Sequence, residues 1–294
     1  MNQLPEINYI ELPEANIAYS IAGRGWPLLL LHGFPETHVA WSQLAPLLEE
    51  EFTLIMADLP GYGDSVVTAH GGDERYTKRN MARLLVAFME KLGYPQFFLA
   101  GHDRGARVAF RLCLDFPNYV KKVALLDIIP TADIADRLSF KLASSLGNWW
   151  FMAQPDPLPE TLLAQNYEFY LEYILHGWSG GKAFFDPLVR SEYSRCFRDP
   201  DSRRAIFAEY RMGNTVDLAD EQQSYERGEK VNCPLLALWS SDGFVTGFGD
   251  PLVIWQNWCD NVSGKQLEAS HFLMEELPLE VSALFRQFFT TDAF

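Results

Sequence analysis

The sequence predicts a mainly parallel, doubly wound α/β sheet with helices on both faces and one inserted helical segment. Short apolar runs bounded by turn residues alternate with longer segments of helical periodicity. With 294 residues, 48% of them hydrophobic, the chain can bury a large core. The alternation stops between about residues 130 and 230. We therefore expect a core over residues 1–129 and 231–294, and a helical cap over 130–230.

Six apolar runs are expected to form strands, at residues 28–31, 53–57, 97–100, 123–126, 235–239 and 266–269. Continuous apolar runs of this length are typical of strands buried on both faces. Three segments with helical periodicity, 76–92, 105–116 and 279–289, are expected to cover the sheet. In the first of them apolar residues recur at spacings of three and four: Met81, Leu84, Leu85, Phe88 and Met89.

The segment 130–230 is rich in aromatic residues and helix formers and contains no obvious strand. Ligands of open α/β sheets bind at the carboxyl ends of the strands, where an inserted cap would cover a substrate pocket. Aromatic residues at this density more often form core. Trp149 and Trp178 are nevertheless the cap residues that we expect to line such a pocket.

The composition excludes several classes of partner. A formal charge of −15 argues against nucleic acid and anionic membranes, both of which need a basic patch. The four cysteines are far apart and no histidines are grouped at metal-ligand spacing, so we expect reduced thiols and neither a metal nor another cofactor. No signal-like or 18-residue apolar segment occurs, which predicts a cytoplasmic protein. Monomer and homodimer both stay open.

The most informative motif is Gly101-His102-Asp103-Arg104-Gly105, which lies between an expected strand and an expected helix. This pattern is typical of a strained strand-to-helix elbow that exposes its central side chain above the sheet. Serine usually stands there, whereas Asp103, with an ordinary pKa of about 3.9, is already ionised at neutral pH. A carboxylate attacks an sp³ carbon that bears a leaving group, so halides and epoxides suit it. An Asp that merely caps the next helix is the simpler alternative.

Hydrolysis of the resulting ester requires a general base, and His271 is the best placed of six histidines. It follows the last expected strand, which matches the order nucleophile, acid, histidine. Two carboxylates stand after strands and could orient it, Asp127 and Asp242. Their positions in the sequence favour neither.

Two further groups are expected beside Asp103. The loop His32-Gly33-Phe34-Pro35 follows a strand and nominates the backbone N–H of Phe34 for an oxyanion hole, with that of Arg104 as the second donor. Pro35 could fix this loop, including as a cis peptide. Arg104 and Arg107 are three residues apart, so they share one helix face, where two guanidinium groups can bind a carboxylate. They indicate an anionic substrate.

With these residues in view, the chain resembles the fluoroacetate and haloacetate dehalogenases of the α/β-hydrolase superfamily, and more distantly the epoxide hydrolases. The resemblance extends over nearly the whole chain and rests on the motifs above together with Asp58-Leu59-Pro60-Gly61-Tyr62-Gly63, Leu126-Asp127-Ile128, Ala153-Gln154-Pro155 and Ser270-His271-Phe272. It implies that Asp127 serves His271, that Arg104 and Arg107 bind the substrate carboxylate, and that the substrate is a small anionic organohalide.

The resemblance also implies a halide pocket made by a His-Trp pair and a tyrosine. In this chain the pair is Asn148-Trp149, and an alignment through Tyr210-Arg211-Met212-Gly213 puts Thr215 at the tyrosine. Two of the three hydrogen-bond donors are thereby altered. We therefore predict that bromo- or chloroacetate is turned over faster than fluoroacetate.

Two other functions compete with dehalogenation. An epoxide hydrolase would use the same Asp103 and His271, with cap tyrosines such as Tyr167, Tyr170, Tyr173 or Tyr210 protonating the ring oxygen. A neutral epoxide leaves the two arginines without a role. A non-catalytic receptor for a small ligand would keep the cavity but would not need the set Asp103, His271 and Asp127.

Overall fold

A computed structural model describes residues 4–291, and the core of this part is a nine-stranded sheet in the order β1-β2-β4-β3-β6-β7-β8-β9, with β5 paired to β2. The pairs from β4 through β9 are parallel, whereas β2 is antiparallel to β1, β4 and β5. The strands are β1 Asn8–Glu11, β2 Ala15–Gly23, β3 Trp26–Leu31, β4 Phe52–Ala57, β5 Val66–Val67, β6 Phe97–His102, β7 Val120–Leu126, β8 Leu235–Ser240 and β9 Val262–Leu267.

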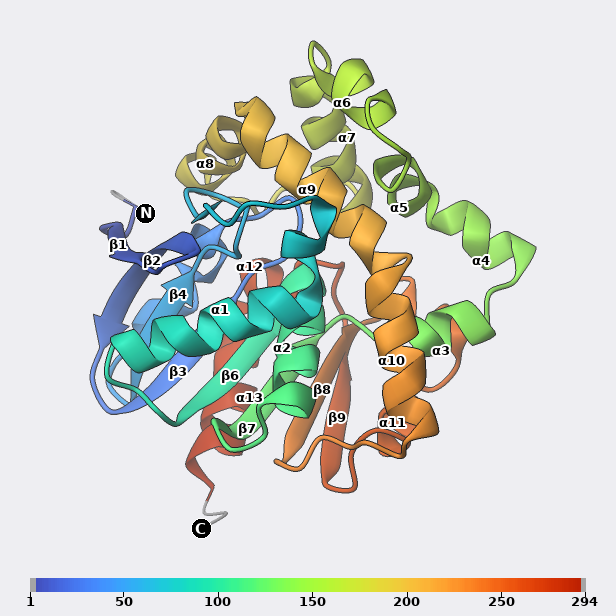
Figure 1. Cartoon of the computed structure of the whole chain (residues 1–294). Coiled ribbons are helices and arrows are strands. Elements are labelled where there is room, and N and C mark those ends of the chain that lie inside the picture. The colour runs from blue at the N-terminus through green and yellow to red at the C-terminus, as the bar shows by residue number, and fades with distance from the viewer. Residues whose placement is uncertain (1–3, 292–294) are drawn as a thin grey trace.

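Helices cover both faces of the sheet (Figure 1). Those of the core are α1 Lys78–Lys91, α2 Asp103–Asp115, α11 Pro251–Gln256, α12 Leu273–Glu276 and α13 Pro278–Thr290, with short 3-10 turns at His38–Trp41, Ala45–Leu47, Asp73–Tyr76 and Val245–Phe248. Helices α1 and α2 lie on one face and α13 lies on the other (Figure 1). The side chain of Thr77 caps α1 by accepting a hydrogen bond from the Asn80 N–H, as the first turn of a helix requires.

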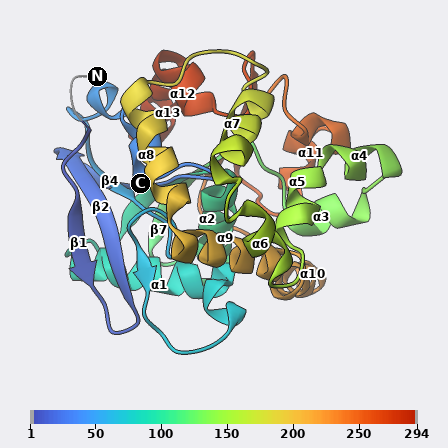
Figure 2. The same ribbon diagram turned by 90° about the horizontal axis from the view of Figure 1, so that it is seen from above.

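Between β7 and β8 the chain forms helices only. They are α3 Thr131–Asp136, α4 Phe140–Ser145, α5 Gly147–Met152, α6 Leu158–Leu163, α7 Tyr167–Trp178, α8 Pro187–Arg198, α9 Pro200–Gly213 and α10 Val216–Glu226. Helices α8 and α9 each begin with an Asp-Pro pair, in which the Asp side chain caps the helix and the proline occupies its first turn. From above, α6 to α9 lie over the sheet (Figure 2). We call this segment, residues 130–230, the cap.

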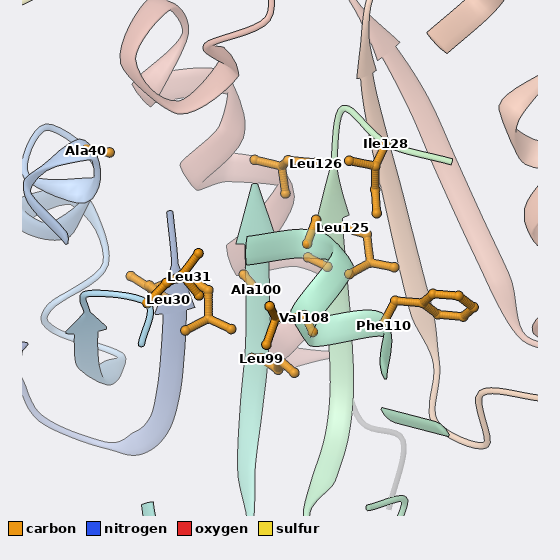
Figure 3. Close-up of a cluster of buried hydrophobic side chains, with 14 of the residues drawn as sticks. Leu30, Leu31, Ala40, Leu99, Ala100, Val108, Phe110, Leu125, Leu126 and Ile128 are labelled. Atoms are coloured by element: carbon orange, nitrogen blue, oxygen red, sulfur yellow. The ribbon is translucent and has the colours of Figure 1, made fainter. Parts of the chain in front are cut away.

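The central strands are buried on both faces, as their apolar runs predict. Leu99 and Ala100 of β6 pair with Val123 and Ala124 of β7, and Val108 and Phe110 of α2 belong to the same buried cluster (Figure 3). On the other face, Phe289 of α13 stacks on Phe98 with ring centroids 5.1 Å apart. This rigid packing fixes the carboxyl ends of β6, β7 and β8, where the site lies.

The edges of the sheet differ from expectation. No apolar run predicts β1, β2 or β5, and the expected last strand covers 266–269, whereas β9 runs from Val262 to Leu267. The β9 residues Val-Ser-Gly-Lys-Gln-Leu are largely exposed, so an edge strand of this kind has no apolar run. None of the described helices is both long and apolar enough to span a membrane.

Candidate active site

Asp103 stands at the sharp junction of β6 and α2 with φ of 43°, in the left-handed region that side chains disfavour. Backbone strain of this kind persists where the surrounding packing enforces it, and it is typical of functional sites. A Cβ on Gly101 would lie 2.6 Å from the carbonyl oxygen of Gly105, and one on Gly105 would lie 2.3 Å from that of His32. The turn therefore requires both flanking glycines.

The loop after β3 contributes a hydrogen-bond donor to Asp103. The Phe34 N–H donates to Asp103 Oδ2 at 3.0 Å, and the Phe34–Pro35 peptide is cis. A Cβ on Gly33 would lie 2.6 Å from Asp103 Cβ, which shows how closely the loop approaches. The Arg104 N–H lies in the first turn of α2, where backbone donors have no partner within the helix. The two donors nominated for an oxyanion hole thus flank Asp103.

His271 is held by the carboxylate that follows β7. Its Nδ1 lies 2.6 Å from Asp127 Oδ2, while Asp127 Oδ1 accepts hydrogen bonds from Ser240 N at 2.9 Å and Ser240 Oγ at 2.8 Å. Asp127 is fully buried and has φ of 53°. With Nδ1 donating to Asp127, the other ring nitrogen of His271 is free to accept a proton. His271 also lines the cavity that contains Asp103.

Asp242, the alternative partner of His271, lies elsewhere. Its side chain is exposed and its Oδ2 lies 3.3 Å from Lys182 Nζ of the cap. Asp242 borders the cavity, and its side chain accepts hydrogen bonds from Lys182 Nζ and Ser241 Oγ. Of the two carboxylates left open by sequence position, the structure brings Asp127 to His271.

The electrostatics around Asp103 favour its ionised form. Burial alone would raise the pKa of Asp103, but the nearby charges of His271, Arg104 and His102 and the Phe34 N–H together lower it below its ordinary value. A buried carboxylate that stays charged at neutral pH is suited to act as a nucleophile.

A cavity of about 220 Å³ lies between Asp103 and the cap. Its walls combine core residues at the ends of the strands with cap residues from α4, α5 and α7 and with Tyr210 of α9. The lining residues are Asp103, Arg104, Ser145, Leu146, Asn148, Trp149, Gly177, Trp178, Gly180, Tyr210, Asp242, Gly243, Phe244 and His271. A space of this size fits a small molecule.

Arg104 is fixed on the cavity wall by a carboxylate that sequence analysis missed. Its Nε and Nη2 donate to both oxygens of Glu209 on α9 at 2.7–3.0 Å, which leaves Nη1 for a ligand. Glu209 is fully buried, pairs with Lys78 and accepts from the Tyr62 hydroxyl at 3.0 Å. Arg104 and Lys78 keep the pKa of Glu209 below its ordinary value despite burial. No local signal links Glu209 to Arg104, because 105 residues separate them.

Arg107 lies one turn further along α2 and does not line the cavity. Its guanidinium lies 4.7 Å from the ring centroid of Trp149, and its Nη1 donates to Ile129 O and Thr131 Oγ1. In residues 4–291 it forms no salt bridge, and its Nε has no partner. Burial and the charge of Arg104 lower its pKa to about 10, so it stays charged at neutral pH. Of the two arginines, Arg104 is among the residues that line the cavity and Arg107 lies behind Trp149.

Of the cap residues predicted from the sequence, three line the cavity and Thr215 does not. Asn148, Trp149 and Trp178 line the cavity, and the Trp178 ring lies edge-on to His271 at 5.1 Å. Within the described part of the chain, the buried Nε1 of Trp149 has no hydrogen-bond partner.

Thr215 lies away from the cavity, contrary to expectation. It is exposed and its hydroxyl donates to Arg211 O, because α9 ends at Gly213 and the chain turns outward to begin α10. The residue that α9 presents to the cavity is Tyr210, over whose ring the Arg104 guanidinium stacks at 4.1 Å.

The order of strands and helices agrees with a comparison to known families. Residues 27–276 match the family model described as the alpha/beta hydrolase fold. The chain therefore belongs to the α/β hydrolase fold family and is a hydrolase, which confirms the predicted fold class.

Its relatives narrow this class. The chain is 34% identical to a fluoroacetate dehalogenase from Burkholderia sp. over 96% of its own length and 93% of that protein. It is also 31% identical to a soluble epoxide hydrolase from Corynebacterium sp. (strain C12) over 88% of each chain. The resemblance to the dehalogenase family and its epoxide hydrolase relatives is thus confirmed.

Solved structures of similar proteins superpose on nearly the whole chain. A protein from Nostoc sp. PCC 7120 described as an α/β hydrolase superposes with a TM-score of 0.93 at 43% identity, covering 98% of both chains. A Pseudomonas aeruginosa protein described as an epoxide hydrolase superposes with a TM-score of 0.93 at 36% identity, covering 98% of this chain and 97% of that one.

Proposed function

We propose that the protein is a hydrolytic dehalogenase of small haloacids such as haloacetate. One observation carries the proposal: an ionised carboxylate, Asp103, lies in a small cavity whose wall contains the Arg104 guanidinium. A substrate that bears both a carboxylate and a leaving group on sp³ carbon would use both features. The substrate carboxylate would bind Nη1 of Arg104, and the charge of Arg107 would add to the attraction.

The reaction has two steps. In the first, an oxygen of Asp103 attacks the carbon that carries the halogen, the carbon–halogen bond breaks with its electron pair, and halide leaves. In the second, His271 takes a proton from water, and the hydroxide attacks Cγ of the Asp103 ester. The ester bond then breaks, His271 gives its proton to the departing oxygen to release the hydroxy acid, and Asp103 loses its remaining proton to solvent and is ionised again. The Phe34 and Arg104 N–H groups would stabilise the oxyanion of this second step.

The departing halide needs hydrogen-bond donors. The indole N–H of Trp149 has no partner among the described residues, and the amide of Asn148 is on the same cavity wall. The Tyr170 hydroxyl lies 3.4 Å from Asn148 Oδ1, so the amide nitrogen remains as the available donor. Both groups support a halide site next to Asp103.

Epoxide hydrolysis is the second candidate, and Tyr210 is the observation that favours it. Tyr210 lines the cavity, and burial keeps its pKa well above the ordinary value, so its hydroxyl would stay protonated and could donate to an epoxide oxygen. The same Asp103 and His271 would then form and hydrolyse a hydroxyalkyl ester. The similarity to the Corynebacterium enzyme supports this reading as well.

Trapping the ester separates these possibilities. His271→Gln removes the base of the second step but leaves Asp103 able to attack. Incubation with bromoacetate, fluoroacetate or a styrene-type epoxide, followed by intact and peptide mass analysis, should show a carboxymethyl ester on Asp103 with the haloacetates. An adduct from the epoxide alone would refute the dehalogenase proposal.

The control for trapping is the double variant Asp103→Asn, His271→Gln, which should acquire no adduct. If the single variant also remains unmodified by every electrophile, a non-catalytic ligand receptor on this fold becomes the better explanation.

A further inference from the structure

A chain of buried polar groups runs behind the site, from the backbone of His271 to the cap. Its members are His102 at the end of β6, Glu36 in the loop after β3, Glu275 on α12 and Tyr193 on cap helix α8. All four are at most 2% exposed. Buried polar groups of this kind must satisfy one another, because water cannot reach them.

His102 must carry a proton on both ring nitrogens. Its Nδ1 lies 2.8 Å from Glu36 Oε2 and its Nε2 lies 2.8 Å from the carbonyl oxygen of His271. The carbonyl oxygen only accepts hydrogen bonds, and Glu36 only accepts because, against the effect of burial, His102 and the Gly33 N–H keep its pKa below the ordinary value. A neutral imidazole, in contrast, has a single N–H. His102 is therefore an imidazolium that donates to Glu36 on one side and to the main chain of His271 on the other.

Within residues 4–291, two carboxyl oxygens of these buried groups have no hydrogen-bond donor. Glu36 Oε2 accepts from His102 and from the Gly33 N–H at 2.7 Å, while Glu36 Oε1 is unpartnered. Glu275 Oε1 accepts from the Tyr193 hydroxyl at 3.1 Å, while Glu275 Oε2 is unpartnered. The two carboxyl groups are within hydrogen-bonding reach of each other. Two buried carboxylates cannot both stay ionised at this separation, and one shared proton supplies the missing donor.

We propose that Glu275 is a neutral carboxylic acid that donates its proton to Glu36 and thereby acts as a positioning residue for His271 and for the oxyanion loop. Glu36 then keeps the negative charge that His102 requires, and it holds Gly33, the neighbour of Phe34. The effect on catalysis rests on the proposed function of His271, whereas the protonation of Glu275 does not. Through Tyr193 the same chain connects the cap to the site.

The charges around these groups agree with the proposal. Burial, then the negative charge of Glu36, raises the pKa of Glu275 well above its ordinary value, and Tyr193 is its other polar neighbour. Burial would lower the pKa of His102, but Glu36, Asp103 and Asp127 raise it to about 9. The rings of His102 and His271 lie 4.6 Å apart, so the protonation of His102 also acts on the catalytic base.

The proposal predicts different effects of substitution at Glu275 and at Glu36. Glu275→Gln should be accepted, because the amide N–H₂ donates to Glu36 where the acid did and the amide oxygen still accepts from Tyr193. Glu275→Leu removes the donor and leaves Glu36 Oε1 buried and unsatisfied. Glu36→Gln removes the charge that keeps His102 protonated.

The protonation state can be measured without any substrate. Infrared difference spectra of wild type and Glu275→Gln at neutral pH should contain the carbonyl band of a protonated carboxylic acid, with a shift in D₂O. Nitrogen NMR should show His102 doubly protonated, with a pKa of about 9 in wild type and Glu275→Gln. The pKa should be lower in Glu36→Gln. An ionised Glu275, or a neutral His102 at pH 7, would overturn the proposal.

The positioning role is tested with the substrate that forms the ester in the trapping experiment. We expect Glu275→Leu to lower kcat about tenfold with little change in KM, and Glu275→Gln to stay within about threefold of wild type. The NMR signal of the His271 proton that is shared with Asp127 should follow the same order, which gives a readout if turnover is absent. Equal losses in the Gln and Leu variants, or no loss in either, would contradict a positioning role. Thermal unfolding of each variant separates misfolding from misplacement.

Discussion

Replacing Asp127 by asparagine tests how His271 is oriented, because the change keeps the shape of the side chain but removes its charge and replaces one acceptor oxygen by an N–H₂ donor. The carboxylate receives three hydrogen bonds, two from Ser240 on Oδ1 and one from His271 on Oδ2. An amide has a single oxygen. If its nitrogen faced Ser240, two buried donors would lose their acceptor, at about 1–3 kcal/mol each.

The asparagine should therefore keep its oxygen toward Ser240 and turn its N–H₂ toward Nδ1 of His271. The imidazole must then accept at Nδ1, and its proton moves to Nε2, so Nε2 can no longer take a proton from water. The same exchange in a serine protease triad lowers kcat about 10⁴-fold, which corresponds to about 5 kcal/mol. We expect a loss of this order in ester hydrolysis alone, because the attack by Asp103 needs no base.

The assay is rapid mixing with bromoacetate, with detection of bromide and of intact mass. Asp127→Asn should release one bromide per active site and then stall as the Asp103 ester. Asp260→Asn is the matched control, since Asp260 is exposed and, within residues 4–291, pairs with Lys230 alone. Asp242→Asn should lose far less activity than Asp127→Asn. Steady turnover within about tenfold of wild type, or no first bromide, would refute the reasoning.

The remaining predictions concern the leaving halide, a glycine of the elbow and the pH dependence of stability. Trp149→Phe removes the indole N–H that has no partner among the described residues, so fluoride release from fluoroacetate should fall about tenfold and bromide release less. Equal losses for the two halides would contradict this expectation. In wild type an ion electrode should record faster turnover of bromo- or chloroacetate than of fluoroacetate, and faster fluoride release would contradict that order. Gly105→Ala forces a Cβ to 2.3 Å from a backbone oxygen and should lower the free energy of unfolding in urea by at least about 1–3 kcal/mol, whereas Gly147→Ala, with open space around it, should be neutral or stabilising by about 0.4–1 kcal/mol. Because the pKa of His102 is raised to about 9, its contribution to stability is complete below about pH 6.5 and is lost as the pH rises through about 9. The free energy of unfolding in urea should show this decline in wild type but not in Glu36→Gln. The same pH dependence in both proteins would contradict the prediction.

The central part of the fold could be predicted from the sequence, whereas the edges could not. The apolar runs mark β3, β4, β6, β7 and β8 to within about three residues at either end, because a strand buried on both faces needs apolar side chains throughout. Strands β1, β2 and β5 escape prediction, and β9 begins four residues before the range expected. None of these strands contains a continuous apolar run of four residues, so backbone pairing with the neighbouring strand decides where each begins and ends.

In the site, the sequence by itself identified the candidate nucleophile, since the glycines that the elbow requires and the aspartate they surround lie within five residues. It also indicated His271 by chain order. Only the tertiary structure chose Asp127 over Asp242, paired Arg104 with Glu209, covered Arg107 with Trp149 and put Tyr210 rather than Thr215 on the cavity. The physical reason is distance along the chain: Asp127 and His271 are 144 residues apart, and Arg104 and Glu209 are 105 apart. Such partners meet only when the cap and the strand ends pack together.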